Sequence, residues 1–382
     1  MTRKFIPFEL ERWQSRWEHR VRYNISESGV HPLSVGELLA IGSVDPDELH
    51  SIRFGYTQGN GSDELRDAIA ALYPDCRREN VITTTGSSEA TFIISWALIE
   101  PGDEVAVLTP TYLQAWGLAQ NLGASVRTFD LEFENSWEPS RESVETAISA
   151  DTKLVVVTNP NNPTGHILSE ETRNVILECA QKTKAWLLVD EVYQGAELNG
   201  ETTQSFWGSY ERVIVTSGLS KAYGLPGLRI GWVVAQPELI EQLWARHDYT
   251  VICPTPTSDF LAQVTLANRS AVLSRTREIL NTNLPILEQW LNKFGTDLEW
   301  LPPQAGAICW VRHPGNPQTP ELAEFLRTEH NLLIVPGEHF GKPGFMRLGY
   351  GNESGELRAA LAALETGLRE RADWSSFVQV AP

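Results

Sequence analysis

Short apolar segments rich in β-branched residues alternate with helix-like segments through the middle of the chain. The apolar segments span residues 80–85, 104–108, 153–158, 185–190 and 212–215. Continuous apolar runs of this length, separated by helices, are typical of parallel strands that are covered on both faces. We therefore expect an α/β fold with a mainly parallel sheet, in a large domain that spans residues 49–275.

The pattern changes after residue 232. A long helical stretch at 258–294 precedes short strands and helices in irregular order. We expect these segments to form a smaller α+β domain over residues 276–382. An N-terminal arm, 1–48, is expected to contribute to that domain, and its residues 8–23 predict an amphipathic helix.

Charge and cysteine content exclude several function classes. The net charge of −18 argues against binding to nucleic acid or anionic membranes. The four cysteines are scattered without a C-x-x-C pair, which is typical of reduced thiols in a cytoplasmic protein and predicts no metal site. No signal-peptide pattern and no membrane-spanning apolar run is visible, so we expect a cytoplasmic location.

One lysine follows the apolar segment 212–215. Lys221 lies in the segment 216–232, where five residues are Gly or Pro, and Arg229 follows eight positions later. The bent backbone would hold both side chains in fixed places. In a water-poor pocket beside a cation, a lysine has a lowered pKa and can act as a nucleophile or base. An arginine can bind phosphate, so the pair suits pyridoxal phosphate (PLP), an aldehyde with a phosphate. The alternative is a surface lysine in a glycine-rich loop.

Other polar or small residues also follow predicted strands. They are Gly86, Tyr112, Asn162 and Asp190. Because ligands bind at the carboxyl ends of parallel strands, one pocket could contain them all. At Asp190 a buried carboxylate is costly unless it is paired, and a pyridinium nitrogen would pair with it.

Gly86 is followed by Ser87 and Ser88, which open a predicted helix whose free N–H groups suit a phosphate. Each of these features also has a purely structural explanation. A serine can cap a helix, a tyrosine can pack in the core, and the Asn-Pro-Thr-Gly segment that contains Asn162 can be a surface turn.

The order of these motifs is more specific than any one of them. Gly-Ser-Ser, Tyr, Asn-Pro-Thr-Gly, Asp-x-x-Tyr, Ser-Lys and Arg resemble, over essentially the whole chain, the fold-type I PLP enzymes of the class I and II aminotransferase family. The resemblance implies that Lys221 bonds the cofactor aldehyde and moves protons. It implies that Asp190 pairs with the ring nitrogen, and that Asn162 and Tyr193 contact the ring hydroxyl.

The same resemblance implies the remaining contacts. Tyr112 would stack on the ring, and Arg347 would bind the α-carboxylate of an amino-acid substrate. The phosphate would be held by Ser87, Ser88, Arg229 and, from the partner subunit, Tyr56. A residue shared in this way implies at least a homodimer.

One position departs from the family pattern. The family usually has Ser or Thr three positions before the lysine, where it contacts the phosphate, and here that position is Gly218. Ser217 or Ser220 would then have to provide this contact.

Four segments suggest a narrower group. Residues 28–31 (Ser-Gly-Val-His), 219–229, 248–249 (Asp-Tyr) and 335–341 resemble the capreomycidine synthase-like hydroxyarginine cyclases, which include the enduracididine-forming cyclase of guanitoxin biosynthesis. The resemblance implies dehydration of a hydroxy-L-arginine and intramolecular addition of its guanidine. A 4-hydroxyl would give L-enduracididine, which we favour, and a 3-hydroxyl would give capreomycidine.

A guanidinium substrate needs acidic or aromatic neighbours. By motif position the candidates are Glu27, His31 and Asp248, and structural loop contacts are the alternative explanation for each. Two other functions stay open. One is transamination between an L-amino acid and a 2-oxo acid, and the other is a non-catalytic protein that has kept the fold.

Overall fold

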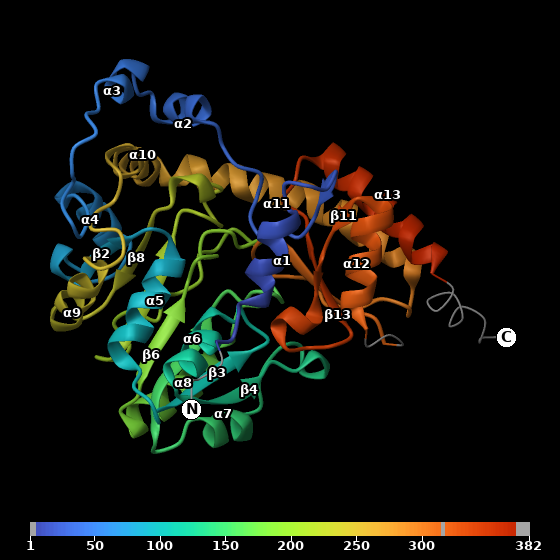
Figure 1. Ribbon diagram of the computed structural model, residues 1–382, viewed down its shortest axis with the longest axis horizontal. Coiled ribbons are helices and arrows are strands. Elements are labelled where there is room, and N and C mark those ends of the chain that lie inside the picture. The colour runs from blue at the N-terminus through green and yellow to red at the C-terminus, as the bar shows by residue number, and fades with distance from the viewer. Residues whose placement is uncertain (1–4, 315–317, 372–382) are drawn as a thin grey trace.

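A seven-stranded sheet forms the core of the computed structural model, which describes residues 5–314 and 318–371 (Figure 1). Its strand order is β2-β8-β7-β6-β5-β3-β4. β8 is antiparallel to both of its neighbours and the other pairs are parallel, so the expected α/β class is confirmed. The strands are β2 (Val81–Thr84), β3 (Glu104–Thr109), β4 (Ser125–Asp130), β5 (Thr152–Thr158), β6 (Trp186–Asp190), β7 (Val213–Gly218) and β8 (Gly231–Val234).

Both faces of this sheet are buried. In β5, Val155 and Val157 belong to one hydrophobic cluster, whereas Leu154 and Val156 belong to another. Because successive strand residues point to opposite faces, this alternation explains why the strands are continuously apolar. The helices of this part are α4 (Asp63–Ala70), α5 (Ser87–Leu98), α6 (Gln114–Leu122), α7 (Arg141–Ala147), α8 (Glu170–Thr183) and α9 (Pro237–His247).

The second, smaller part is built on an antiparallel sheet of order β12-β13-β10-β9. Its strands are β9 (Glu299–Trp300), β10 (Ile308–Arg312), β12 (Val335–Pro336) and β13 (Phe345–Gly349), and its helices include α12 (Thr319–His330) and α13 (Ser354–Glu370). α10 (Pro256–Ala267) and the long α11 (Arg269–Leu291) lead into it from the large part (Figure 1). The domain boundary expected after residue 275 falls inside α11, and the domain limits stay a prediction.

The N-terminal arm runs between the two parts. Its helix α1 (Glu9–Trp17) lies between the central sheet and the smaller part (Figure 1). The backbone of Ile6 exchanges two 2.9 Å hydrogen bonds with the side chain of Asn121 on α6, and Trp13 Nε1 donates to the Ile334 carbonyl at 2.9 Å. The arm is therefore attached to both parts. The helix ends at Trp17, earlier than expected, because the chain turns at 18–20.

After α1 the arm joins the smaller part through a short parallel pair of strands, β1 (Tyr23–Asn24) and β11 (Leu332–Leu333). It continues through α2 (Val35–Gly42) and α3 (Pro46–His50) toward the large part. The short 3-10 helices are η1 (Arg78–Asn80), η2 (Phe133–Asn135), η3 (Pro226–Leu228), η4 (Asn292–Phe294) and η5 (Gly337–Phe340). Within 5–314 and 318–371, none of the helices has the length and hydrophobicity needed to cross a bilayer.

Glu191 is a buried acid directly after β6. It is 2% exposed, and its Oε1 accepts hydrogen bonds from the Phe206 N–H and the Ser205 hydroxyl, both at 2.9 Å. Its Oε2 has no hydrogen-bond partner among the described residues. Burial raises the pKa of Glu191 to about 7 from an ordinary value of 4.5, although these partners oppose the change.

This raised pKa predicts a pH-dependent stability. Between about pH 4.5 and 7 the native state holds a proton that the unfolded chain has released, so the free energy of unfolding falls as the pH rises through this window. Glu191→Gln removes this contribution, and we expect it to lose less stability than the wild type between pH 5 and 8, by on the order of 2 kcal/mol. Urea unfolding at both pH values measures the difference. Glu238→Gln, at an exposed position on α9, should behave like the wild type, and a Glu191→Gln curve parallel to the wild type would contradict the assignment.

Candidate active site

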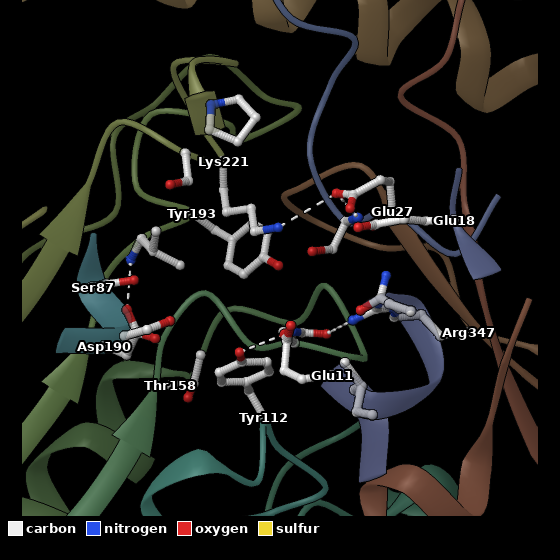
Figure 2. A pocket seen from close by; sticks show the side chains of 18 of the residues that line it. Glu11, Glu18, Glu27, Ser87, Tyr112, Thr158, Asp190, Tyr193, Lys221 and Arg347 are labelled. Carbon is white, nitrogen blue, oxygen red and sulfur yellow. Dashed lines mark hydrogen bonds and ion pairs between the residues drawn. The ribbon is translucent and has the colours of Figure 1, made fainter. Parts of the chain in front are cut away.

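A cavity of about 300 Å³ lies at the carboxyl ends of the central strands (Figure 2). The large part provides Ser87, Ser88, Tyr112, Thr158, Asn162, Asp190, Val192, Tyr193, Ser220, Lys221, Pro226 and Arg229. The N-terminal arm provides Leu10, Glu11, Gln14, Glu18, Glu27 and Ser28, and β13 provides Arg347. Residues that are far apart in the sequence therefore share one cavity.

Glycine allows a close approach at one end of this cavity. Gly86 precedes α5 with φ +76°, and a Cβ on it would lie 2.3 Å from Arg229 Nη2. Only glycine leaves room for the guanidinium at this place. The first N–H groups of α5 have no partner inside the helix, and Ser87 and Ser88 add their hydroxyls. Together with Arg229 they form a donor set that suits a phosphate.

Close packing explains why position 218 is a glycine, where the family usually has Ser or Thr. A Cβ on Gly218 would lie 2.9 Å from the carbonyl oxygen of Ile230, which directly precedes β8. Of the two serines expected to replace the missing hydroxyl, Ser220 lines the cavity. Ser217 does not, because it is buried and its hydroxyl donates to the Glu191 carbonyl at 3.3 Å.

Polar groups that fit an aromatic heterocycle lie beside the end of β6. Asp190 Oδ1 accepts from the Val192 N–H at 3.1 Å. Burial raises the pKa of Asp190 to about 6, although this hydrogen bond and Lys221 oppose the change. A cationic ring nitrogen would therefore stabilise its charged form. The hydroxyl of Tyr193 is buried without a hydrogen-bond partner among the described residues, so it is available to a ligand.

The electrostatics of Lys221 differ from the sequence-based expectation. Its Nζ lies 3.6 Å from Glu27 Oε2 (Figure 2). Burial is the largest single influence and disfavours the charged amine, but the Glu27 carboxylate together with Tyr193 and Glu11 outweighs it, so the pKa of Lys221 lies above its ordinary value. The expectation of a lowered pKa was wrong for this state of the protein. Lys221 in turn is the main reason that the pKa of Glu27 is lowered.

Arg347 is a buried cation. It is 1% exposed, and its guanidinium donates to Asn162 Oδ1 at 2.9 Å and to the Ser26 carbonyl at 2.6 Å. Its Nε has no hydrogen-bond partner, and no carboxylate lies within ion-pair distance among the residues that the structure describes. A buried charge without a counter-charge is costly, so a bound carboxylate would stabilise this arrangement.

Besides Ser217, three further expected site residues lie outside the cavity. Tyr56 is 88% exposed on the surface. His31 lies 3.2 Å from a carboxylate oxygen of Glu353, and burial lowers its pKa, as does nearby Arg275. Asp248 follows the last residue of α9. The alternative explanation, structural loop contacts, therefore accounts for His31.

The sequence analysis missed two acids and an amide at the mouth of the cavity. Glu11 accepts a 2.6 Å hydrogen bond from the Tyr112 hydroxyl, and Gln14 Nε2 donates to the Ser26 carbonyl at 3.0 Å. Burial raises the pKa of Glu18, as does the negative charge of Glu27. Spacing could have revealed them, because positions 11, 14 and 18 share one face of a helix.

Comparisons with known proteins agree with this geometry. Residues 41–364 match the family model described as aminotransferase class I and II. The chain is 33% identical over 365 residues to capreomycidine synthase of Streptomyces vinaceus, which covers 94% of this chain and 93% of that protein. It is 27% identical to an aspartate aminotransferase of Thermotoga maritima, over 83% of this chain and 84% of the relative.

Solved structures give the same result. A PLP-dependent aminotransferase from Streptococcus suis superposes with a TM-score of 0.90 at 32% identity, over 96% of this chain and 98% of that chain. The PLP-dependent cyclase OrfR superposes with a TM-score of 0.89 at 28% identity, over 97% and 99%.

The residues around the cavity fit PLP. The start of α5 and Arg229 suit the phosphate, Asp190 suits the ring nitrogen, and the unpartnered Tyr193 hydroxyl suits the ring hydroxyl. The protein is a PLP-dependent enzyme with the aminotransferase fold, and the chain belongs to the class I and II aminotransferase family.

Proposed function

We propose that this enzyme cyclises a hydroxy-L-arginine, and specifically that it converts 4-hydroxy-L-arginine into L-enduracididine. The reaction removes water and joins a guanidine nitrogen to the carbon that carried the hydroxyl. The observation that carries the proposal is the distribution of charge in the cavity. Arg347 is buried, and the carboxylates of Glu11 and Glu18 line the same cavity (Figure 2). This distribution suits an amino acid with a cationic side chain.

In this proposal, each motif that follows a strand of the central sheet has a role in the cofactor site. Bound PLP supplies an electron sink for the carbanion that forms when the α-proton is removed. Lys221 removes and returns protons at the substrate carbons, and Asp190 keeps the ring nitrogen protonated. The substrate carboxylate binds to Arg347. The phosphate is held by Ser87, Ser88, Ser220 and Arg229.

The substrate side chain lies along the N-terminal arm in this proposal. Glu11 is held by the Tyr112 hydroxyl, which fixes one carboxylate oxygen and leaves acceptor sites on the other. A guanidinium has five donors in a planar fork, and carboxylates are its best partners. Glu11 and Glu18 would therefore orient the guanidine and help to exclude water from the reacting atoms.

Incubation of the purified enzyme with 3- and 4-hydroxyarginine isomers, without a 2-oxo acid, tests the reaction. We expect a product lighter by one water from a 4-hydroxy isomer, with the five-membered ring visible by NMR. A Lys221→Ala control should give no product. A six-membered product from a 3-hydroxy isomer would instead indicate a capreomycidine-forming enzyme. Product that appears only with a 2-oxo acid and is not cyclic would favour an aminotransferase, the activity of several relatives.

Glu11→Gln tests recognition of the guanidinium. Loss of one charged hydrogen bond, roughly 1.5–3 kcal/mol, should raise KM for hydroxyarginine by about 10-fold or more, with a smaller change in kcat. Steady-state kinetics measure both constants. The matched control is Glu9→Gln, because Glu9 lies on the exposed side of the same helix. An unchanged KM in Glu11→Gln would remove Glu11 from the binding site.

We also propose that the enzyme is a homodimer in which Tyr56 reaches the partner's phosphate site. Aromatic side chains are exposed near one another. Tyr56 and Tyr249 are 88% and 83% exposed, and Trp96 lies 5.9 Å from Tyr249 between ring centroids. The Thr57 hydroxyl donates to the Pro254 carbonyl at 2.7 Å, which brings the two loops together. Such a surface is typical of an interface between protein chains.

Sedimentation equilibrium should therefore give twice the chain mass of 42.7 kDa. Trp96→Asp should shift the enzyme toward monomer and weaken PLP binding. Tyr56→Phe should keep the dimer and weaken PLP binding modestly, because it removes only one hydroxyl. A monomeric wild type that binds PLP tightly would contradict the shared site.

A further inference from the structure

Dehydration at the γ-carbon requires the enzyme to remove more protons from the substrate than transamination does. The proposed reaction, on which this inference rests, removes protons from both Cα and Cβ around the departure of the γ-hydroxyl. A neutral lysine amine can hold only one proton at a time, so it must give up the Cα proton before it takes the Cβ proton. A second acceptor within reach of Lys221 would let the site hold both protons at once.

Glu27 has the required position. Its Oε2 lies 3.6 Å from Lys221 Nζ, and among the described residues no other acid lies within ion-pair distance of this amine. Its side chain lines the cavity and is 48% exposed, so it is open to a bound substrate. The Ser28 N–H also donates to Oε2, at 3.3 Å.

The backbone around Glu27 is fixed. The N–H of Ile25 donates to the Leu333 carbonyl at 3.0 Å, and the Gly349 N–H donates to the Ile25 carbonyl at 2.7 Å. The glycine is required there, because a Cβ on Gly349 would lie 2.1 Å from the Glu27 carbonyl oxygen. The backbone that carries Glu27 is thus held next to strands of the smaller part.

We propose that Glu27 is a catalytic residue that relays protons for Lys221, so that the pair can store two protons during the reaction. The Cα–H bond breaks and its proton goes to Nζ. An N–H bond then breaks as an O–H bond forms on Glu27, and the neutral amine is ready to take the Cβ proton.

The complete proton balance closes with no further reactant. Three protons leave the substrate, from Cα, from Cβ and from the guanidine nitrogen that forms the new C–N bond. Three return from the Lys221–Glu27 pair, to the departing hydroxyl, to Cβ and to Cα. The C–O bond breaks and water leaves, so the product is lighter by one water. Transamination needs only the first of these transfers, and Lys221 alone is sufficient for it.

The test measures deuterium incorporation into L-arginine, which lacks the hydroxyl and so cannot eliminate water. With the PLP-loaded wild type in D₂O, NMR should show exchange at both Cα and Cβ. Glu27→Gln should keep Cα exchange within a few-fold and lower Cβ exchange by about 100-fold. Glu27→Asp should restore part of the Cβ exchange.

Glu9→Gln is the matched control, because Glu9 is an acid of the same N-terminal arm at an exposed position outside the cavity. It should leave the ratio of Cβ to Cα exchange unchanged. A second readout does not depend on catalysis. In the full chain before PLP is added, the titration midpoint of Lys221, followed by NMR of the methylated amine, should fall by about 1 pH unit or more in Glu27→Gln.

The outcomes separate this inference from the proposed function. If Glu27→Gln lowers deuterium exchange at Cα and Cβ equally, or lowers neither, the relay is overturned. This holds even if the wild type forms L-enduracididine. A wild type that forms no cyclic product from any hydroxyarginine overturns the proposed function, whatever the exchange ratios are.

Discussion

Compensation of buried charge at one edge of the central sheet is the constraint on which the site depends. Asp190, Lys221 and Arg347 all line one cavity, and burial is the largest influence on the pKa of each. An ionised group in such a place is costly unless another group pairs with it. Of these three groups, Lys221 alone has an ion-pair partner among the described residues, and that partner is Glu27. Asp190 and Arg347 are left for partners of opposite charge, and a protonated ring nitrogen and a substrate carboxylate are such partners.

The geometry of the sheet places these groups together. Parallel strands end at the same edge, so residues that directly follow β2, β6 and β7 meet although the chain separates them widely. Gly86 and Gly218 remove the side chains that would keep the neighbouring backbone or Arg229 at a distance. The cofactor site is therefore a consequence of strand order combined with close backbone packing.

Because the cofactor site lies at strand ends, the site residues that directly follow apolar segments could be predicted from the sequence. Ser87, Asp190 and Lys221 each follow an apolar run, so local pattern was enough to bring them to one cavity. His31 and Asp248 were chosen by position in a motif, and the structure places both outside the cavity. Motif position carries no information about which way a loop side chain points.

The electrostatic state of Lys221 was not predictable in the same way. Its partner Glu27 lies far away in the sequence, and the two meet only because strands of the smaller part hold the arm in place. The sequence around Lys221 contains Arg229 but gives no sign of the Glu27 carboxylate. Glu11 could have been found, because the helix that carries it was expected, but its direction depends on contacts with Asn121 and Ile334.

The attachment of the N-terminal arm to both parts of the protein has a consequence for how this fold can diversify. The acids at the mouth come from the first 27 residues, whereas the phosphate and ring contacts come from the large part. Under the proposed function, replacement of this short terminal segment would alter which substrate side chain is accepted while the residues that bind the cofactor stay the same. Cofactor binding and recognition of the substrate side chain would then be encoded in separate stretches of the gene.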